Sequence, residues 1–256
     1  MSRYPKGTLS CIGTTQLYTR NPFVVAWWSA AFPGFGHMLL NMHLKGNIFF
    51  LFEIVINVNA HLNLAMVDTF CGNFSLAKDT LNTRWCLLYI PFYIFCIWDS
   101  YRSAVEINKL DYLSTNEPLD IQPVSLTNYE TCFLDKRVPI TAAMFSLFMP
   151  GLGQIYVRRT IPAIAILAWT LVITFYSRDL ESLSLLFSWN VEEAKTVLDM
   201  EWLLFFPSLI FGASYDAFVS VFEQNDLFIL AQRHYLLKQW QPKGFTVNLF
   251  ARNEDK

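Results

Sequence analysis

Apolar residues gather into six stretches along the chain, and polar segments separate them. The stretches form two similar series, 23–41, 47–61 and 85–101 followed by 139–157, 161–176 and 202–222. A helix that crosses the hydrocarbon core of a bilayer needs about 20 mainly apolar residues, so this pattern predicts membrane-embedded helices. In each series, Pro-Gly-x-Gly interrupts the first stretch, at Pro33, Gly34 and Gly36 and at Pro150, Gly151 and Gly153. Because proline removes a helical hydrogen bond and glycine loosens the backbone, both first stretches are expected to break there.

The two series are related by a shift of 117 positions. At that offset the Pro-Gly-x-Gly residues coincide, and so do Trp85 with Trp202, Asp99 with Asp216 and Asn108 with Asn225. Shared membrane composition would align Leu with Leu but not Pro, Gly, Trp, Asp and Asn at one offset, so we infer an internal duplication. The predicted organisation is a polar tail (1–21), repeat 1 (22–108), a linker (109–138), repeat 2 (139–225) and an amphipathic tail (226–256). The amphipathic tail is predicted either to continue the last helix or to lie in the membrane interface.

Each broken stretch can be read as a kinked span or as a re-entrant hairpin that enters and leaves on one face. Cytoplasmic segments carry an excess of Lys and Arg. Re-entrant hairpins place 15 of the 19 Lys and Arg residues inside, whereas six full spans place only 12 there. The distribution therefore favours an all-α integral membrane protein of two homologous three-segment repeats. Each repeat is a broken hairpin plus two transmembrane helices, with both termini cytoplasmic.

Composition agrees with membrane embedding and excludes several other classes. The chain of 256 residues is 54% hydrophobic and only 16% charged, with a net charge of −2. Soluble domains are about a quarter charged, and nucleic-acid-binding domains are usually basic, so neither class fits. Five cysteines without a CxxC spacing, Cys11 in the amino-terminal tail among them, and four scattered histidines indicate no disulfide framework and no metal site. We expect no cofactor.

Three polar residues share one face of the second apolar stretch. Glu53, Asn57 and His61 recur at intervals of four residues, which places them on one side of a helix. Ionisable residues at membrane depth often mark a functional path, and polar residues also hold helices together. Both interpretations remain open. Repeat 2 has Thr170, Thr174 and Arg178 at these places, so any site would be one-sided.

Asp99 and Asp216 close the third stretches at equivalent positions. They are expected to cap the free N–H groups of the broken hairpins or to pair with Arg102 or Arg20. Acid–base catalysis by this pair is the less favoured interpretation, because no nucleophile or metal-ligand set accompanies it.

The broken hairpins carry a resemblance to a known family. The segments SAAFPGFGHM (29–38), KG (45–46) and SLFMPGLGQIY (146–156), with IWDSYRSA (97–104) and SYDAF (214–218), resemble the TM2-like group of small bacterial membrane proteins. The chain is similar to a tandem version found in spore-forming Firmicutes. It departs from the pattern where His37 stands at the place of Gln154 and where Arg158-Arg159 stands in place of an Asn-Gly turn. The resemblance implies a multi-pass membrane location and no common chemistry.

These features predict a non-enzymatic protein of the cell membrane that acts as an accessory or scaffold subunit. Its expected partners are the lipid bilayer and another membrane protein or a second copy of itself. The alternative is a small transporter or channel component with a polar path near Glu53 and His61.

Overall fold

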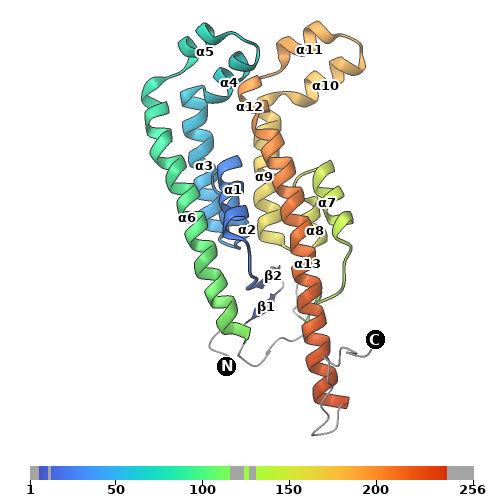
Figure 1. Ribbon diagram of the computed structural model, residues 1–256. Helices are drawn as coiled ribbons and strands as arrows, with labels where there is room; N and C mark the ends of the chain where they lie inside the picture. Colours follow the sequence, from blue (N-terminus) through green and yellow to red (C-terminus); the bar gives the residue numbers. More distant parts are fainter. Residues whose placement is uncertain (1–5, 11–12, 116–123, 127–130, 241–256) are drawn as a thin grey trace, which may run out of the picture.

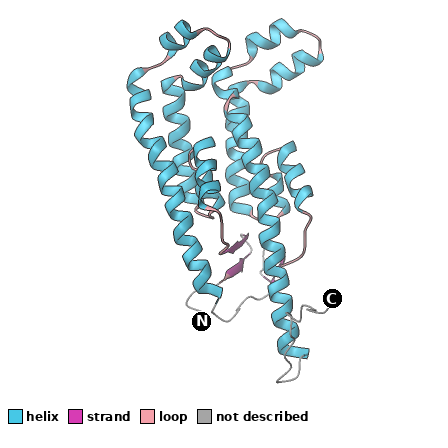
Figure 2. Cartoon of the chain, in the orientation of Figure 1, coloured by secondary structure: helices cyan, strands magenta, loops and turns pink. Residues whose placement is uncertain are grey.

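The computed structural model describes residues 6–10, 13–115, 124–126 and 131–240, and the arrangement is almost entirely helical (Figures 1 and 2). Cys11, positions 116–123 of the linker and positions 241–256 of the tail lie outside the described residues. The first half comprises β1 (Gly7–Ser10), β2 (Gly13–Gln16), α1 (Pro22–Ala31), α2 (Phe35–Leu39), α3 (His43–Ala60), α4 (Leu62–Phe70), α5 (Phe74–Thr80) and α6 (Thr83–Thr115).

The second half runs through a similar series of elements. It comprises β3 (Val124–Leu126), β4 (Thr131–Phe133), α7 (Pro139–Phe148), α8 (Leu152–Tyr156), α9 (Thr160–Ser177), α10 (Asp179–Phe187), α11 (Val191–Val197), α12 (Met200–Leu203) and α13 (Phe205–Trp240). From α1 to α5, each helix begins and ends 117 residues before its counterpart in the series α7 to α11.

The first apolar stretch of each half is a broken pair of short helices. Phe32 and Met149 end α1 and α7 in extended conformations, as expected for residues that precede a proline. Gly34 and Gly151 follow with φ of 96° and 105°, in the left-handed region that glycine adopts without strain. The break therefore falls at Pro-Gly, as the sequence predicts.

Both ends of the first broken pair lie at the end of the bundle that carries the strands, here called the β end. The backbone N–H and C=O of Arg20, just before α1, both form hydrogen bonds with the side chain of Asn108, near the carboxyl end of α6. Asn41, just after α2, donates to the carbonyl oxygen of Gln16 in β2. Between them the tip reaches Tyr93, whose hydroxyl donates to Ala30 O. The chain thus leaves the β end along α1 and returns to it along α2 (Figure 1).

Two helices are long and apolar enough to cross a membrane, α9 and the continuous run α12–α13. The pair α3 and α4, bent by 61° at His61, makes a third if it counts as one span. This supports a membrane protein with fewer qualifying helices than the four expected. The fourth expected span, α6, does not qualify; its apolar run between the charged residues Arg84 and Asp99 is short and contains Pro91, Tyr89 and Tyr93.

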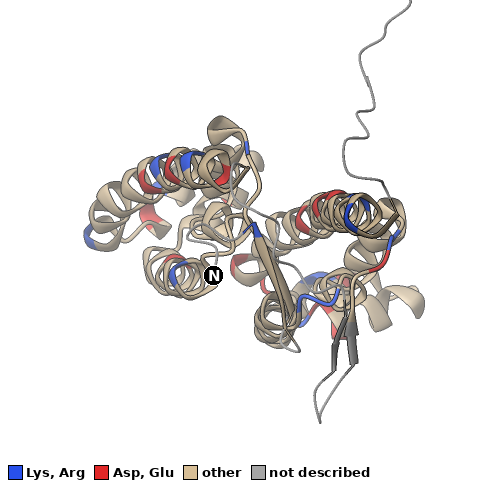
Figure 3. Ribbon diagram, turned by 90° about the horizontal axis from the view of Figure 1, so that it is seen from below, with Lys and Arg blue, Asp and Glu red and all other residues tan. Residues whose placement is uncertain are grey.

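The long helices extend beyond the predicted stretches. α6 continues to Thr115, past the predicted boundary at 108, and α13 continues to Trp240. Residues 226–240 therefore continue the last helix rather than forming a separate interfacial helix. Seen from the β end, acidic and basic positions are interspersed along the helices, and most of the ribbon carries no charge (Figure 3).

The β-hairpins were not expected from the sequence. β1 pairs antiparallel with β2, and β3 pairs antiparallel with β4. Gly13, the first residue of β2, has a φ of 143°. Each hairpin lies in a segment predicted only as polar tail or linker.

The main core lies between the two halves. Phe32, Phe35, Phe50 and Ile54 of the first half pack with residues of α9 and α13, including Ile166, Ile173, Leu209 and Ala213. The ring of Phe35 lies so close to α13 that a Cβ on Gly212 would be 2.7 Å from it. At the opposite end from the strands, here called the cap end, α4–α5 and α10–α11 form two helical hairpins (Figure 1).

Candidate functional site

Two equivalent carboxylates face the second helix of each broken pair. Asp99 on α6 lies 2.7 Å from Nε2 of His37 in α2 and 2.5 Å from Nζ of Lys45 in α3. The His37 side chain is fully buried, whereas that of Asp99 keeps 14% of its surface exposed. This carboxylate therefore connects three segments of the first half.

Asp216 on α13 occupies the corresponding place but is almost completely buried, with 2% exposure. It accepts hydrogen bonds from Gln154 Nε2 at 3.0 Å and from Arg159 Nη1 at 2.8 Å. The other end of the guanidinium, Nη2, donates to Asn41 Oδ1 at 2.7 Å. Since Asn41 belongs to the first half, the guanidinium of Arg159 joins the two halves by this hydrogen bond while it is ion-paired with Asp216 of its own half.

These contacts differ from those expected for the two aspartates. Both touch the broken pairs through side chains, at His37 and Gln154, rather than by accepting backbone N–H groups. The expected cationic partners bind other acids. Arg102 pairs with Glu106 on the helix surface, and Arg20 pairs with Glu223. The sequence shows equivalent aspartates but not which cation packs beside each.

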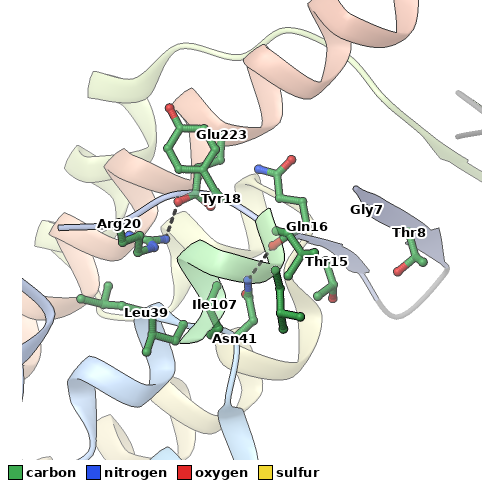
Figure 4. Close-up of a pocket in the computed structure, with 13 residues that line it drawn as sticks. Gly7, Thr8, Thr15, Gln16, Tyr18, Arg20, Leu39, Asn41, Ile107 and Glu223 are labelled. Carbon is green, nitrogen blue, oxygen red and sulfur yellow. Dashed lines mark hydrogen bonds and ion pairs between the residues drawn. The ribbon is translucent and has the colours of Figure 1, made fainter. Parts of the chain in front are cut away.

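A cavity of about 400 Å³ lies beside this junction at the β end. Its walls come from β1–β2, the end of α2, the lower part of α6 and Glu223 on α13. Figure 4 shows Arg20, Tyr18 and Glu223 grouped on one side, with Gln16 and Thr15 of β2 on another. Most of the remaining lining is apolar, from Leu17, Leu39, Leu40, Ile107 and Leu110.

An ion pair across the two halves forms one side of this cavity. Arg20 Nη2 lies 2.6 Å from Glu223 Oε1, and both side chains are more than nine-tenths buried. Tyr18 donates to Asp226 Oδ2 at 3.1 Å, so a second contact from the amino-terminal segment reaches α13. Burial and the hydrogen bond to Asp226 raise the pKa of Tyr18, so its hydroxyl keeps its proton at neutral pH.

The predicted polar face of α3 is divided by the structure. Glu53 and Asn57 are buried, and Glu53 Oε1 accepts from Asn57 Nδ2 at 3.1 Å and from Tyr89 OH at 3.2 Å. His61 does not continue this face, because α3 ends at Ala60 and His61 adopts a left-handed conformation with an exposed side chain.

The polar contacts continue from Asn57 into the second half. Asn57 Nδ2 also donates to Asn63 Oδ1 in α4, at 3.4 Å. Asn63 Nδ2 in turn donates to Glu201 O at 2.8 Å, and Glu201 Oε2 accepts from the backbone N–H of Leu64 at 2.9 Å. A buried polar chain thus connects Glu53 in α3 with α12.

Sequence reasoning missed several residues of this site, although the 117-residue offset contained a signal for two of them, Asn108 and Asn225. Asn108 exchanges two hydrogen bonds with the backbone of Arg20, and Asn225 exchanges the same two with Arg137. Both pairs coincide at the 117-residue offset. Glu223 coincides with Glu106 and Arg20 with Arg137 at the same offset, but Glu106 pairs with Arg102 and Arg137 with Asp135, so the offset does not indicate the pair of Arg20 with Glu223. Arg159 falls on Met42, so the offset contains no signal for its ion pair.

Within the described parts of the chain, no group of three or more His, Cys, Asp or Glu residues could hold a metal ion. A search against protein-family models, curated proteins and solved structures finds no match to this chain. Its function is therefore inferred from the geometry alone.

Proposed function

We propose that the protein is a non-enzymatic, multi-pass membrane protein that serves as an accessory or scaffold subunit of another membrane protein. One observation carries this proposal. The charged groups buried at the junction form two ion pairs, Arg20 with Glu223 between the halves and Arg159 with Asp216 within the second half. Buried pairs of this kind hold one arrangement of helices, and removing either partner is strongly destabilising.

The proposed architecture is two duplicated units in the cell membrane. Coincident helix bounds from α1 to α5 and the repeated asparagine contact with the segment before α1 or α7 support it. In this arrangement α3, α6, α9 and α13 cross the bilayer, and the two broken pairs are re-entrant. The β end and both termini face the cytoplasm, as the excess of Lys and Arg favours. The TM2-like resemblance is compatible with this arrangement and adds no activity.

The proposed contact surface for a partner is the pair of aromatic tips at the cap end. Phe70 and Phe74 flank the turn between α4 and α5, and Phe187 and Trp189 lie at the turn between α10 and α11. Their exposed fractions run from 68% to 90%. Tryptophan and phenylalanine that are exposed in a free subunit are frequent anchors of protein interfaces. The partner would present an apolar surface on the same side of the membrane.

The test is crosslinking of the tagged protein in its native membrane, followed by identification of what is recovered with it. We expect one stoichiometric membrane protein with the wild type, and its loss from the double variant Phe187→Ser/Trp189→Ser. Trp240→Ser is the matched control, because Trp240 is 75% exposed at the far end of α13. Recovery of the protein alone, or equal recovery of the partner with both variants, would overturn the proposal.

The buried polar chain from Glu53 to Glu201 favours a second candidate, a small transporter or channel component. Polar groups that cross between two halves of a membrane protein are a common basis of an ion path. If this candidate is correct, wild-type protein in liposomes should conduct ions, and Glu53→Gln should change that ion flux. Wild-type flux equal to that of empty liposomes would eliminate it.

A further inference from the structure

A wide cavity lies at the cap end, where α9 meets α10. It has a volume of about 1330 Å³ and is lined by the end of α9, by α10, by the end of α11 and by the segment leading into α12, with Leu64 of α4 at its edge. Pockets for small molecules usually measure roughly 300–1,000 Å³, so this one suits a larger ligand. We call the junction of α9 with α10, residues 174–182, the second elbow.

The corresponding junction of α3 with α4, residues 57–65, is the first elbow, and it is closed. There the backbone N–H of Leu64 donates to Glu201 Oε2, and Asn63 donates to Glu201 O, so α12 is bound to α4. By the 117-residue offset, the start of α6 is the counterpart of α12, and Arg84 corresponds to Glu201. Among the described residues no hydrogen bond or ion pair connects the start of α6 with α10. The second elbow therefore stays open.

The two elbows also differ in charge. Arg178, Glu181 and Asp199 line the open one, whereas the closed one has His61, Leu64 and Asn82 at the corresponding positions. Asp199 uses Oδ1 to cap α12, accepting from the backbone N–H of Glu201. Within the described residues the guanidinium of Arg178 and the carboxylate of Glu181 form no ion pair. One cation and two carboxylates thus stand around the same cavity.

The position of the cavity suits a lipid. α9 is one of the helices able to cross a membrane, and Arg178 is the first residue after its end. Headgroups lie where the apolar part of a spanning helix ends. Below Arg178, the side chains of Leu171 and Phe175 line the same cavity and are 62% and 76% exposed. The cavity therefore combines a charged rim with an apolar wall that continues down the helix.

We propose that the second elbow binds a zwitterionic phospholipid whose headgroup carries a primary ammonium. The phosphate is held by Arg178, the ammonium donates to Glu181 and Asp199, and an acyl chain lies along Leu171 and Phe175. An anionic headgroup fits less well, because two carboxylates oppose it. A quaternary ammonium has no N–H to donate to them. This site requires α9 to span the bilayer but does not depend on the partner or the transport role.

The test is native mass spectrometry of the full-length, delipidated protein in detergent with added phosphatidylethanolamine, phosphatidylcholine or phosphatidylglycerol. We expect one phosphatidylethanolamine per chain, bound at least about tenfold more tightly than phosphatidylcholine, a difference of about 1.4 kcal/mol. Arg178→Gln should weaken the binding of phosphatidylethanolamine by at least about tenfold. Glu181→Gln should reduce the difference in affinity between phosphatidylethanolamine and phosphatidylcholine.

Two variants at the same end of the molecule serve as controls, Arg84→Gln for the cation and Glu192→Gln for the carboxylate. Both residues are exposed and lie outside the cavity lining, so both variant proteins should bind lipid as the wild type does. Equal binding of all three lipids, tighter binding of phosphatidylglycerol, or equal effects of Arg178→Gln and Arg84→Gln would overturn the proposal. Displacement of phosphatidylethanolamine by inorganic phosphate would overturn it in favour of a free-anion site.

Discussion

Replacing one glycine by alanine in each broken pair tests how closely its two helices pack. A Cβ on Gly36 would lie 2.4 Å from Val25 O and 2.3 Å from Ser29 Oγ, both in α1. A Cβ on Gly153 would lie 2.3 Å from the backbone oxygen of Ala142 in α7. Contacts this short require the neighbour to move, and a carbonyl oxygen inside a helix moves only with that helix.

The size of the effect follows from these distances. The short helix must shift by about 1 Å to relieve these contacts. We expect this overpacking to lower the free energy of unfolding by about 1–3 kcal/mol for each substitution. The loss for Gly153→Ala should lie at the upper end of this range, because its Cβ would also lie 2.8 Å from Ala217 Cβ in α13. The two sites share no contacts, so their effects should add in the double variant.

Gly72→Ala is the matched control. Gly72 has a φ of 82° and no neighbour within 4 Å of an added Cβ, so only backbone strain applies. Trp189, its counterpart at the 117-residue offset, adopts a φ of 59° with a full side chain. We therefore expect a loss of about 1 kcal/mol, at the lower end of the left-handed penalty.

The assay is reversible unfolding of the purified protein in mixed micelles of increasing SDS content, followed by far-ultraviolet circular dichroism. Ser29→Ala in the Gly36→Ala background separates the hydroxyl from the carbonyl contact, because only the hydroxyl contact is removed. If Gly36→Ala and Gly153→Ala each lost no more stability than Gly72→Ala, the close approach of the paired helices would be wrong.

Three further predictions concern the junction and the cap end. Arg159→Met should lower the unfolding free energy by about 3–5 kcal/mol, because it leaves Asp216 buried without its cation; adding Asp216→Asn should recover part of the loss, and no recovery would contradict the ion-pair argument. Asn225→Ala should cost about 1–3 kcal/mol in the same unfolding assay, since two backbone groups of the segment before α7 lose their partner; a neutral result would contradict this. In intact cells, a membrane-impermeant maleimide should label Cys71, which is exposed at the cap end, and should spare Cys96, which is buried; labelling that appears only after lysis would place the cap end in the cytoplasm.

The candidate site could be predicted from the sequence only where its chemistry is local or repeated. Asp99 and Asp216 coincide at one offset, and the amino-acid pattern alone marks them as equivalent. Their partners differ, with Lys45 and His37 at one and Arg159 and Gln154 at the other. Lys45 and Arg159 do not coincide at the offset, so the repeat contains no information about which cation pairs with each aspartate.

The polar face of α3 shows the same limit. Spacing by four places Glu53, Asn57 and His61 on one side of an ideal helix, and the first two do lie together. The third leaves the face because the helix ends one residue earlier. The same helix end recurs at the 117-residue offset, where α9 ends at Ser177 and Arg178 is left-handed. It therefore does not depend on the contact of α12 with α4, and the spacing of polar residues contains no signal for it.

Local sequence is sufficient for the broken helices and for the lengths of most apolar segments. Pro-Gly sets a helix break through the conformation of the preceding residue and the left-handed glycine, which are properties of two or three neighbouring residues. Long-range packing is what brings Arg20 to Glu223 and Arg159 to Asn41, and it closes one elbow while the other stays open. These outcomes depend on how two similar halves pack against each other, and unequal residues at equivalent positions, such as Glu201 and Arg84, give the two halves different contacts.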